Sequence, residues 1–83
     1  MKKMTMKVIV KTDGETTRFT LATNGMEVGI INPDWCNKGK YQGRYEIWGA
    51  CNNTDLPHAF EFVGDGIERM FSRYGIAVEF EQV

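Results

Sequence analysis

The fold of this 83-residue chain depends on residues 65–74, which read Asp-Gly-Ile-Glu-Arg-Met-Phe-Ser-Arg-Tyr. Four apolar side chains recur there at i, i+3, i+4 and i+7, a spacing that gathers them into one stripe along a helix. They are Ile67, Met70, Phe71 and Tyr74. Asp65 suits an N-cap with Glu68 as its capping-box partner, and Gly75 suits the left-handed residue that follows a helix. The segment predicts an amphipathic helix whose apolar stripe is buried against the rest of the chain.

Upstream of this helix, the sequence predicts a three-stranded antiparallel meander. Apolar and polar residues alternate over residues 5–12, 16–23 and 26–31, the period of a half-buried strand. Asp13-Gly14 and Asn24-Gly25 separate these segments, and both dipeptides tolerate the positive φ angles of tight hairpin turns. Local turn chemistry therefore fixes the order of the first three strands.

Two further segments, residues 41–51 and 76–82, alternate in the same way and predict two more strands. Residues 32–40 and 52–57 each contain a proline among Asn, Asp and other turn-forming residues, and we interpret both as loops.

Residues 58–63 are compatible with either a short strand or the first turns of the helix. A continuous helix would contain Gly64 and Gly66, each of which costs about 1 kcal/mol relative to alanine, and would leave the Asp65 cap unused. We therefore favour a strand over residues 58–63 followed by a separate helix.

Together these elements predict a single α+β domain over residues 1–83. It consists of an antiparallel sheet of five or six strands, one helix packed on one face, and a final strand after the helix. The sheet residues expected to face the helix are Met6, Val8, Val10, Phe19, Leu21, Val28, Ile30, Ile47, Val78 and Phe80. The residues expected on the solvent face are Lys7, Lys11, Arg18, Thr20 and Glu27.

The composition, 42% hydrophobic and 25% charged, is that of an ordinary globular domain. A domain this small has a limited core, so packing against a second copy would add stability, and a homodimer is an open alternative. The sequence contains no signal-peptide core and no apolar run long enough to cross a bilayer. We expect a cytoplasmic protein in which Cys36 and Cys51 are free thiols.

Charge is unevenly distributed along the chain. Residues 1–50 contain eight Lys and Arg against five Asp and Glu, whereas residues 51–83 contain two against six. This balance falls short of that of a dedicated nucleic-acid binder. The acidic residues of the second half predict a patch that would meet a basic partner. They are Asp55, Glu61, Asp65, Glu68, Glu79 and Glu81.

A second candidate surface combines aromatic and basic side chains. Its members are Trp35, Lys38, Lys40, Tyr41, Arg44 and Trp48. Such a mixture stacks the bases and neutralises the phosphates of a single nucleic-acid strand. The same residue types are equally those of a protein-binding hot spot.

Catalytic or metal chemistry would depend on Cys36, Cys51 and His58, with Asp34 or Asp55 as a further donor or orienting group. No pair among them has the close spacing of a metal-binding motif, and a small free cysteine is more often buried than reactive. We predict no catalytic residue, metal or other cofactor.

Elimination therefore favours a small non-enzymatic protein-binding module that acts by occupying a partner's surface. In size and architecture, though without a shared motif, the chain resembles the stoichiometric inhibitors that phages and other mobile elements direct against host proteins, including anti-CRISPR proteins. The alternative is a single-stranded nucleic-acid-binding domain that uses the Trp35–Trp48 region. A third is a small thiol enzyme or metal protein around Cys36, Cys51 and His58.

Overall fold

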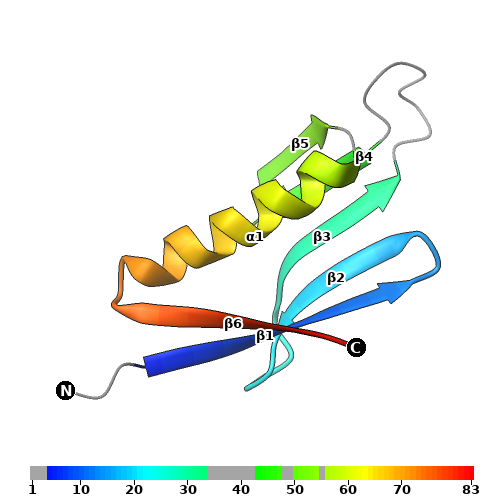
Figure 1. Cartoon of the computed structure of the whole chain (residues 1–83). Helices are drawn as coiled ribbons and strands as arrows, with labels where there is room; N and C mark the ends of the chain where they lie inside the picture. The colour runs from blue at the N-terminus through cyan, green and yellow to red at the C-terminus, as the bar shows by residue number, and fades with distance from the viewer. Residues whose placement is uncertain (1–3, 34–42, 48–49, 55) are drawn as a thin grey trace.

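The computed structural model describes residues 4–33, 43–47, 50–54 and 56–83, which form a sheet with one helix across it (Figure 1). The strands and the helix are, in chain order, β1 (Met4–Asp13), β2 (Thr16–Leu21), β3 (Glu27–Pro33), β4 (Gly43–Ile47), β5 (Ala50–Thr54), α1 (Leu56–Ser72) and β6 (Ile76–Gln82). The α+β class, the helix in the C-terminal half and the final strand are confirmed.

The described strands form one six-stranded sheet in the order β5-β4-β3-β2-β1-β6. The pairs from β1 to β5 are antiparallel, whereas β6 pairs with β1 in parallel, with Met4 opposite Ile76 and Val10 opposite Gln82. The prediction of a wholly antiparallel sheet is therefore wrong. The helix carries the chain from β5 at one edge to β6 at the other, and this crossover connection is what permits parallel pairing.

The N-terminal meander is confirmed, and both of its turns have the predicted chemistry. Gly14 and Gly25 have φ angles of 65° and 73°, in the left-handed region that glycine enters without steric cost. In the second turn, the Asn24 side-chain oxygen accepts a 2.9 Å hydrogen bond from the Met26 amide. These local interactions fix where each strand ends.

The predicted single strand over residues 41–51 is wrong in its boundaries, because two strands, β4 and β5, occupy this region and pair with each other. Residues 52–57 were predicted to be a loop. Residues 52–54 instead belong to β5, and the helix begins at Leu56.

The helix is longer than predicted, because it starts at Leu56 rather than at Asp65. Residues 58–63 are helical and not a strand, and Asp65 lies in the helix interior instead of capping its first turn. Gly66 lies where the helix meets β4: a Cβ built on it would be 2.8 Å from Cδ1 of Ile47. Close packing against the sheet therefore outweighs the helix-propensity cost of glycine.

The helix ends at Ser72, and Gly75, with a φ of 72°, turns the chain into β6 as predicted. Tyr74 was expected in the buried stripe. It lies instead in this turn, with 74% of its surface exposed, because the helix ends before it. Of the other stripe residues, Ile67 is fully buried, and Met70 and Phe71 are half-buried.

The core lies between the sheet and α1. Its buried hydrophobic residues are Val8, Val10, Phe19, Leu21, Val28, Ile31, Ala59, Val63 and Ile67. Met6, Ile47, Val78 and Phe80 are partly buried against this cluster, as predicted. Among the described residues, these apolar side chains link every strand from β1 to β4 and β6 to the helix.

One core prediction is wrong by a single residue: Ile31 is buried, whereas Ile30 is only half-buried. The cause is a register shift between β2 and β3. Phe19 is opposite Gly29 but Thr20 is opposite Glu27, so Val28 is an extra residue in β3. A bulge of this kind reverses the alternation of the strand from that point on.

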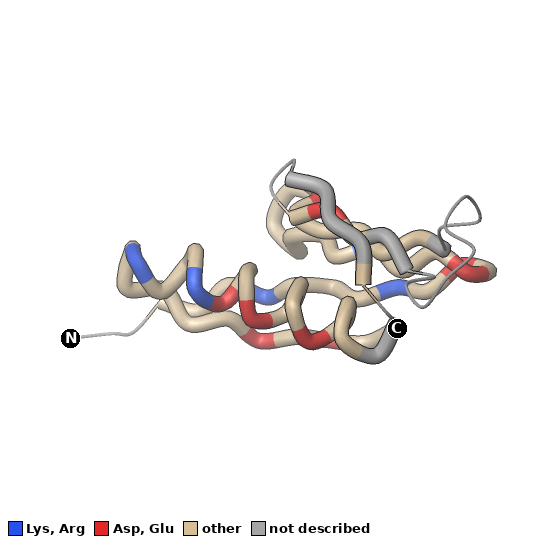
Figure 2. The backbone as a smooth tube through the Cα atoms, turned by 90° about the horizontal axis from the view of Figure 1, so that it is seen from above, with Lys and Arg blue, Asp and Glu red and all other residues tan. Residues whose placement is uncertain are grey.

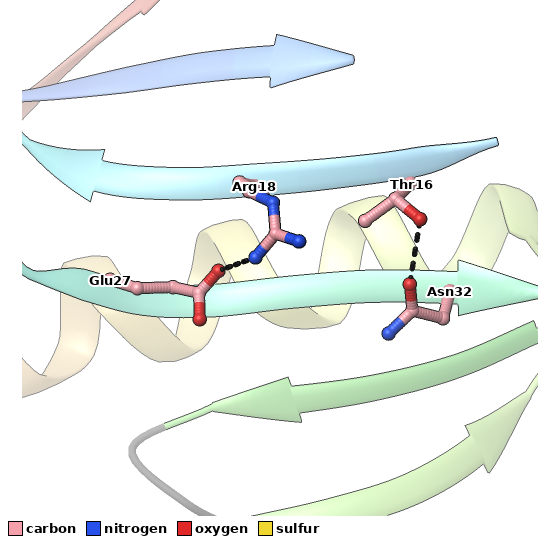
Figure 3. Close-up of polar contacts among 4 residues, drawn as sticks. All are labelled: Thr16, Arg18, Glu27 and Asn32. Carbon is pink, nitrogen blue, oxygen red and sulfur yellow. Dashed lines mark hydrogen bonds and ion pairs between the residues drawn. The ribbon is translucent and has the colours of Figure 1, made fainter. Parts of the chain in front are cut away.

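The sheet face opposite the helix is polar, as predicted. Arg18 of β2 donates to Glu27 of β3 at 2.6 Å, and the Thr16 hydroxyl donates to the Asn32 side-chain oxygen at 2.8 Å (Figure 3). On the same face, Lys7 lies 3.6 Å from Glu81. These cross-strand pairs cover β1, β2, β3 and β6, so oppositely charged and hydrogen-bonding groups already offset one another on much of this face.

Candidate binding surface

The outer face of α1 carries three carboxylates in a row. Glu61, Asp65 and Glu68 stand at i, i+4 and i+7, so they lie on one exposed face of the helix, and we call them the acidic stripe. None of the three has an ion-pair or hydrogen-bond partner among the described residues. Figure 2 shows acidic positions spaced along α1, with basic positions toward its C-terminal end. No ion pair in the described part of the chain therefore neutralises the stripe, and the nearest cation along the helix is the exposed Arg69, one turn after Asp65.

An open groove lies between the C-terminal half of α1 and the start of β6, with a volume of about 510 Å³. We call it the α1–β6 groove. It is lined by Asp65, Glu68, Arg69, Ser72, Ile76, Ala77 and Val78. On its helix side the groove has two carboxylates of the acidic stripe together with Arg69 and Ser72, and on its strand side it has the apolar residues Ile76, Ala77 and Val78.

A smaller pocket of about 220 Å³ lies along the other half of the same strand. We call it the Phe60 pocket. It is lined by Val10, Phe19, Phe60, Gly64, Phe80 and Gln82. Phe19 and Phe80 meet edge to face, with ring centroids 6.3 Å apart, and Phe60 remains 42% exposed. The pocket is mostly apolar and could hold a partner's hydrophobic side chain.

β6 contributes residues to both cavities, and no described strand pairs with its outer edge. The Val83 amide donates to the Val10 carbonyl at 3.0 Å, so the odd-numbered residues of this segment direct their backbone groups toward β1. Because backbone groups alternate in direction along a strand, the N–H and C=O groups of Val78 and Phe80 point toward the open edge.

The structure brings together only part of the predicted acidic patch. Glu61, Asp65 and Glu68 share the helix surface, whereas the pairing of Lys7 with Glu79 places Glu79 and Glu81 on the opposite face of the sheet. Glu81 is also paired with Lys7. Asp55 lies outside the described residues. The six acidic residues therefore do not form one continuous patch in the described part of the structure.

The aromatic and basic surface lies almost wholly outside the described residues. This applies to Trp35, Lys38, Lys40, Tyr41 and Trp48. The backbone of Arg44 belongs to β4, but its side chain also lies outside the description. Binding of nucleic acid or protein by this surface stays a prediction.

The residues considered for thiol or metal chemistry are similarly divided. Cys36 is outside the described residues, and Cys51 is placed only by its backbone, in β5. His58 is exposed on α1, where its ring stacks with that of Phe62 at a centroid distance of 6.0 Å. Among the described residues, no three His, Cys, Asp or Glu side chains are grouped closely enough to hold a metal ion.

Sequence reasoning missed the α1–β6 groove and the Phe60 pocket, because both depend on β6 lying at the sheet edge next to β1. One available signal was the helical spacing of Ala59, Val63 and Ile67, which extends the apolar stripe upstream of Asp65. This spacing would have placed Phe60 on the helix, although not beside Phe80.

Comparison of the chain with protein-family models, curated proteins and solved structures finds no match in any of the three. Within the described residues, the structure contains no helix that is long and apolar enough to span a membrane. Functional inference therefore depends on the geometry and charge of the chain itself.

Proposed function

We propose that this protein is a small protein-binding module that recognises a basic partner through the acidic stripe and the adjoining α1–β6 groove. The observation that supports this proposal is the row of three exposed carboxylates beside an open groove with apolar residues on its other side. Charged side chains around an apolar centre are typical of surfaces that steer and then hold a partner.

The pairing state of the charges supports the choice of this face over the opposite one. On the open face of the sheet, Arg18 and Lys7 already have carboxylate partners. The carboxylates of the acidic stripe have no such partner among the described residues. A basic partner would therefore gain more electrostatic interaction energy at the stripe than on the sheet face.

The proposal includes the mode of action expected from the sequence, in which binding occupies the partner's surface and inhibits the partner. Once a partner is captured, its activity should fall in proportion to the amount of complex formed. A stoichiometric inhibitor would reach full inhibition at about one equivalent when the protein concentrations are well above Kd.

The test is affinity capture from a lysate of the source organism, with the wild-type chain and a stripe variant carrying Glu61→Gln, Asp65→Asn and Glu68→Gln. These replacements preserve side-chain size and remove charge. The control carries Asp13→Asn and Glu15→Gln, which remove two of the negative charges elsewhere on the surface, at the exposed hairpin turn between β1 and β2. Circular dichroism would establish that all three proteins fold alike.

We expect one protein to be captured by the wild type and the control, to be lost from the stripe variant, and to dissociate as salt is raised. Capture that is unchanged in the stripe variant would contradict the proposal. Salt-sensitive binding of a single-stranded oligonucleotide that depends on Trp35 and Lys40 would instead favour the nucleic-acid alternative.

A further inference from the structure

The edge of β6 has three properties that together define an unfilled position for one more strand. It is at the end of the described sheet, it directs the backbone groups of Val78 and Phe80 outward, and its residues line the α1–β6 groove and part of the Phe60 pocket. Its seven residues include no proline, and proline would have reduced its capacity to pair. An exposed strand edge of this kind is a template for an additional strand.

We propose that the partner binds by adding an extended segment, in which basic and apolar side chains alternate, to the edge of β6. This inference rests on the proposed function for the existence of a basic partner, and it adds Glu79 and Glu81, on the sheet face away from the helix, to the carboxylates that this partner would meet. Main-chain hydrogen bonds to Val78 and Phe80 would give affinity, and side chains on the two faces of the added strand would give specificity.

Side chains on the two faces of the added strand would meet different surroundings. On the helix side, they would meet Ile76, Val78, Phe80 and Gln82 of β6, with Asp65, Glu68 and Arg69 of the helix beyond them. On the opposite side, they would meet Glu79 and Glu81, which point away from the helix. Because side chains alternate along a strand, apolar residues at every second position would pack on Ile76, Val78 and Phe80, and lysine or arginine between them would face Glu79 and Glu81.

The charge of β6 argues against a second copy of this chain as the occupant. If two β6 strands paired antiparallel, the Glu79 and Glu81 side chains of the two copies would lie on the same face of the joined sheet. Like charges opposite each other across a strand pair are destabilising. Only Glu81 has a described cationic partner, Lys7, so Glu79 would remain uncompensated. A basic strand removes this repulsion.

The test uses the full-length protein labelled with ¹⁵N and a synthetic peptide of about seven residues, in which lysine alternates with valine or phenylalanine, to match the length of an ordinary strand. A second peptide has glutamate in place of lysine. Two more peptides are N-methylated, one at every lysine and the other at every apolar residue, so each lacks the N–H groups of one edge of its strand.

We expect the lysine peptide to slow hydrogen exchange of the Val78 and Phe80 amides by about tenfold or more at saturation. The glutamate peptide should bind at least about tenfold more weakly, which corresponds to about 1.4 kcal/mol. One N-methylated peptide should lose binding and the other should retain it, because only one edge of the added strand faces β6.

Binding without protection of Val78 and Phe80, or an equal effect of the two N-methylations, would overturn strand addition. The proposed function would still stand if the stripe variant lost its captured partner. Conversely, protection of these amides by the lysine peptide, together with unchanged capture by the stripe variant, would support strand addition and contradict the proposed function. If the protein without peptide were a dimer in which the Val78 and Phe80 amides were already protected from exchange, a second copy would occupy the β6 edge. That result would overturn the proposal.

Discussion

Gly29 of β3 lies directly against Val63 of α1: a Cβ built on Gly29 would be 2.6 Å from Cγ1 of Val63. The same Cβ would be 3.5 Å from Cδ1 of Ile67. The helix therefore approaches the sheet more closely at position 29 than a residue with a side chain at that position would allow. Val63 and Ile67 are both fully buried by this approach, which sets the depth of the helix over the sheet.

Replacing Gly29 with alanine should destabilise the protein by about 1–3 kcal/mol, because the added methyl group must displace a buried, β-branched side chain. Chemical denaturation would measure the loss. Adding Val63→Ala should relieve the clash, so the double variant should lose less stability than the two single variants predict by addition. If the loss of stability in the double variant equalled the sum of the two single losses, the close contact between position 29 and Val63 would be contradicted.

The two glycines within α1 should respond oppositely to alanine. Gly64 has only the Phe80 ring within reach of a new Cβ, at 3.9 Å, so Gly64→Ala should stabilise the protein by about 0.5–1 kcal/mol through helix propensity. At Gly66 the Cβ would be 2.8 Å from Cδ1 of Ile47, and the resulting displacement should cancel or exceed that gain. Thermal unfolding of the two variants, which differ only in position, provides the comparison. Equal increases in Tm would contradict the close contact at Ile47.

Two apolar residues of the original helical stripe should differ sharply in their contribution to stability. Ile67→Ala should cost about 2–5 kcal/mol, because Ile67 is fully buried and its truncation leaves a cavity. Tyr74→Ala should change stability by less than about 0.5 kcal/mol, because Tyr74 is 74% exposed in the turn after the helix. Equilibrium unfolding in urea would measure both values. A large loss of stability in Tyr74→Ala would contradict the exposed position of this side chain.

The ion pair between Arg18 and Glu27 should contribute little to stability. Its guanidinium-to-carboxylate distance is 2.6 Å, but the two side chains are 55% and 41% exposed. A double-mutant cycle with Arg18→Gln and Glu27→Gln should give a coupling energy of about 0.2–1 kcal/mol, falling as salt is added. A coupling energy well above this range, or one insensitive to salt, would contradict a solvent-exposed pair.

Sequence reasoning succeeded where short-range chemistry determines the structure. Asp13-Gly14 and Asn24-Gly25 fix the first two turns through their own backbone preferences, and the alternation in β1 fixes which face is buried. The same logic gave the turn at Gly75 and the strand that follows it. None of these features depends on the position of a distant residue.

The errors arose where a distant contact outweighs a local preference. Gly64 and Gly66 argued against a long helix on propensity alone, yet Gly66 fits the contact with Ile47 that a larger residue would disturb. Alternation in residues 76–82 is the same for a parallel and an antiparallel strand, so it could not reveal the pairing with β1. The bulge at Val28 shifted the buried position from Ile30 to Ile31, and the local signal for it was Gly29, since an isolated glycine within a strand pattern often accompanies a bulge.

The candidate site was predicted only in part for the same reason. Helical spacing was sufficient to group Glu61, Asp65 and Glu68 once the helix was known to start at Leu56. To see that the stripe lies beside β6, one must also know the strand order. That order depends on the pairing of β6 with β1, which are far apart in the sequence.

The parallel pairing of β6 with β1 also has a consequence for synthesis on the ribosome. The first strand of the sheet acquires its outer neighbour only after residues 76–82 have emerged, so until then the backbone groups of β1 that pair with β6 remain open. The complete sheet can therefore form only after this region has been synthesised, and the edge of β1 is open to pairing with other chains until then.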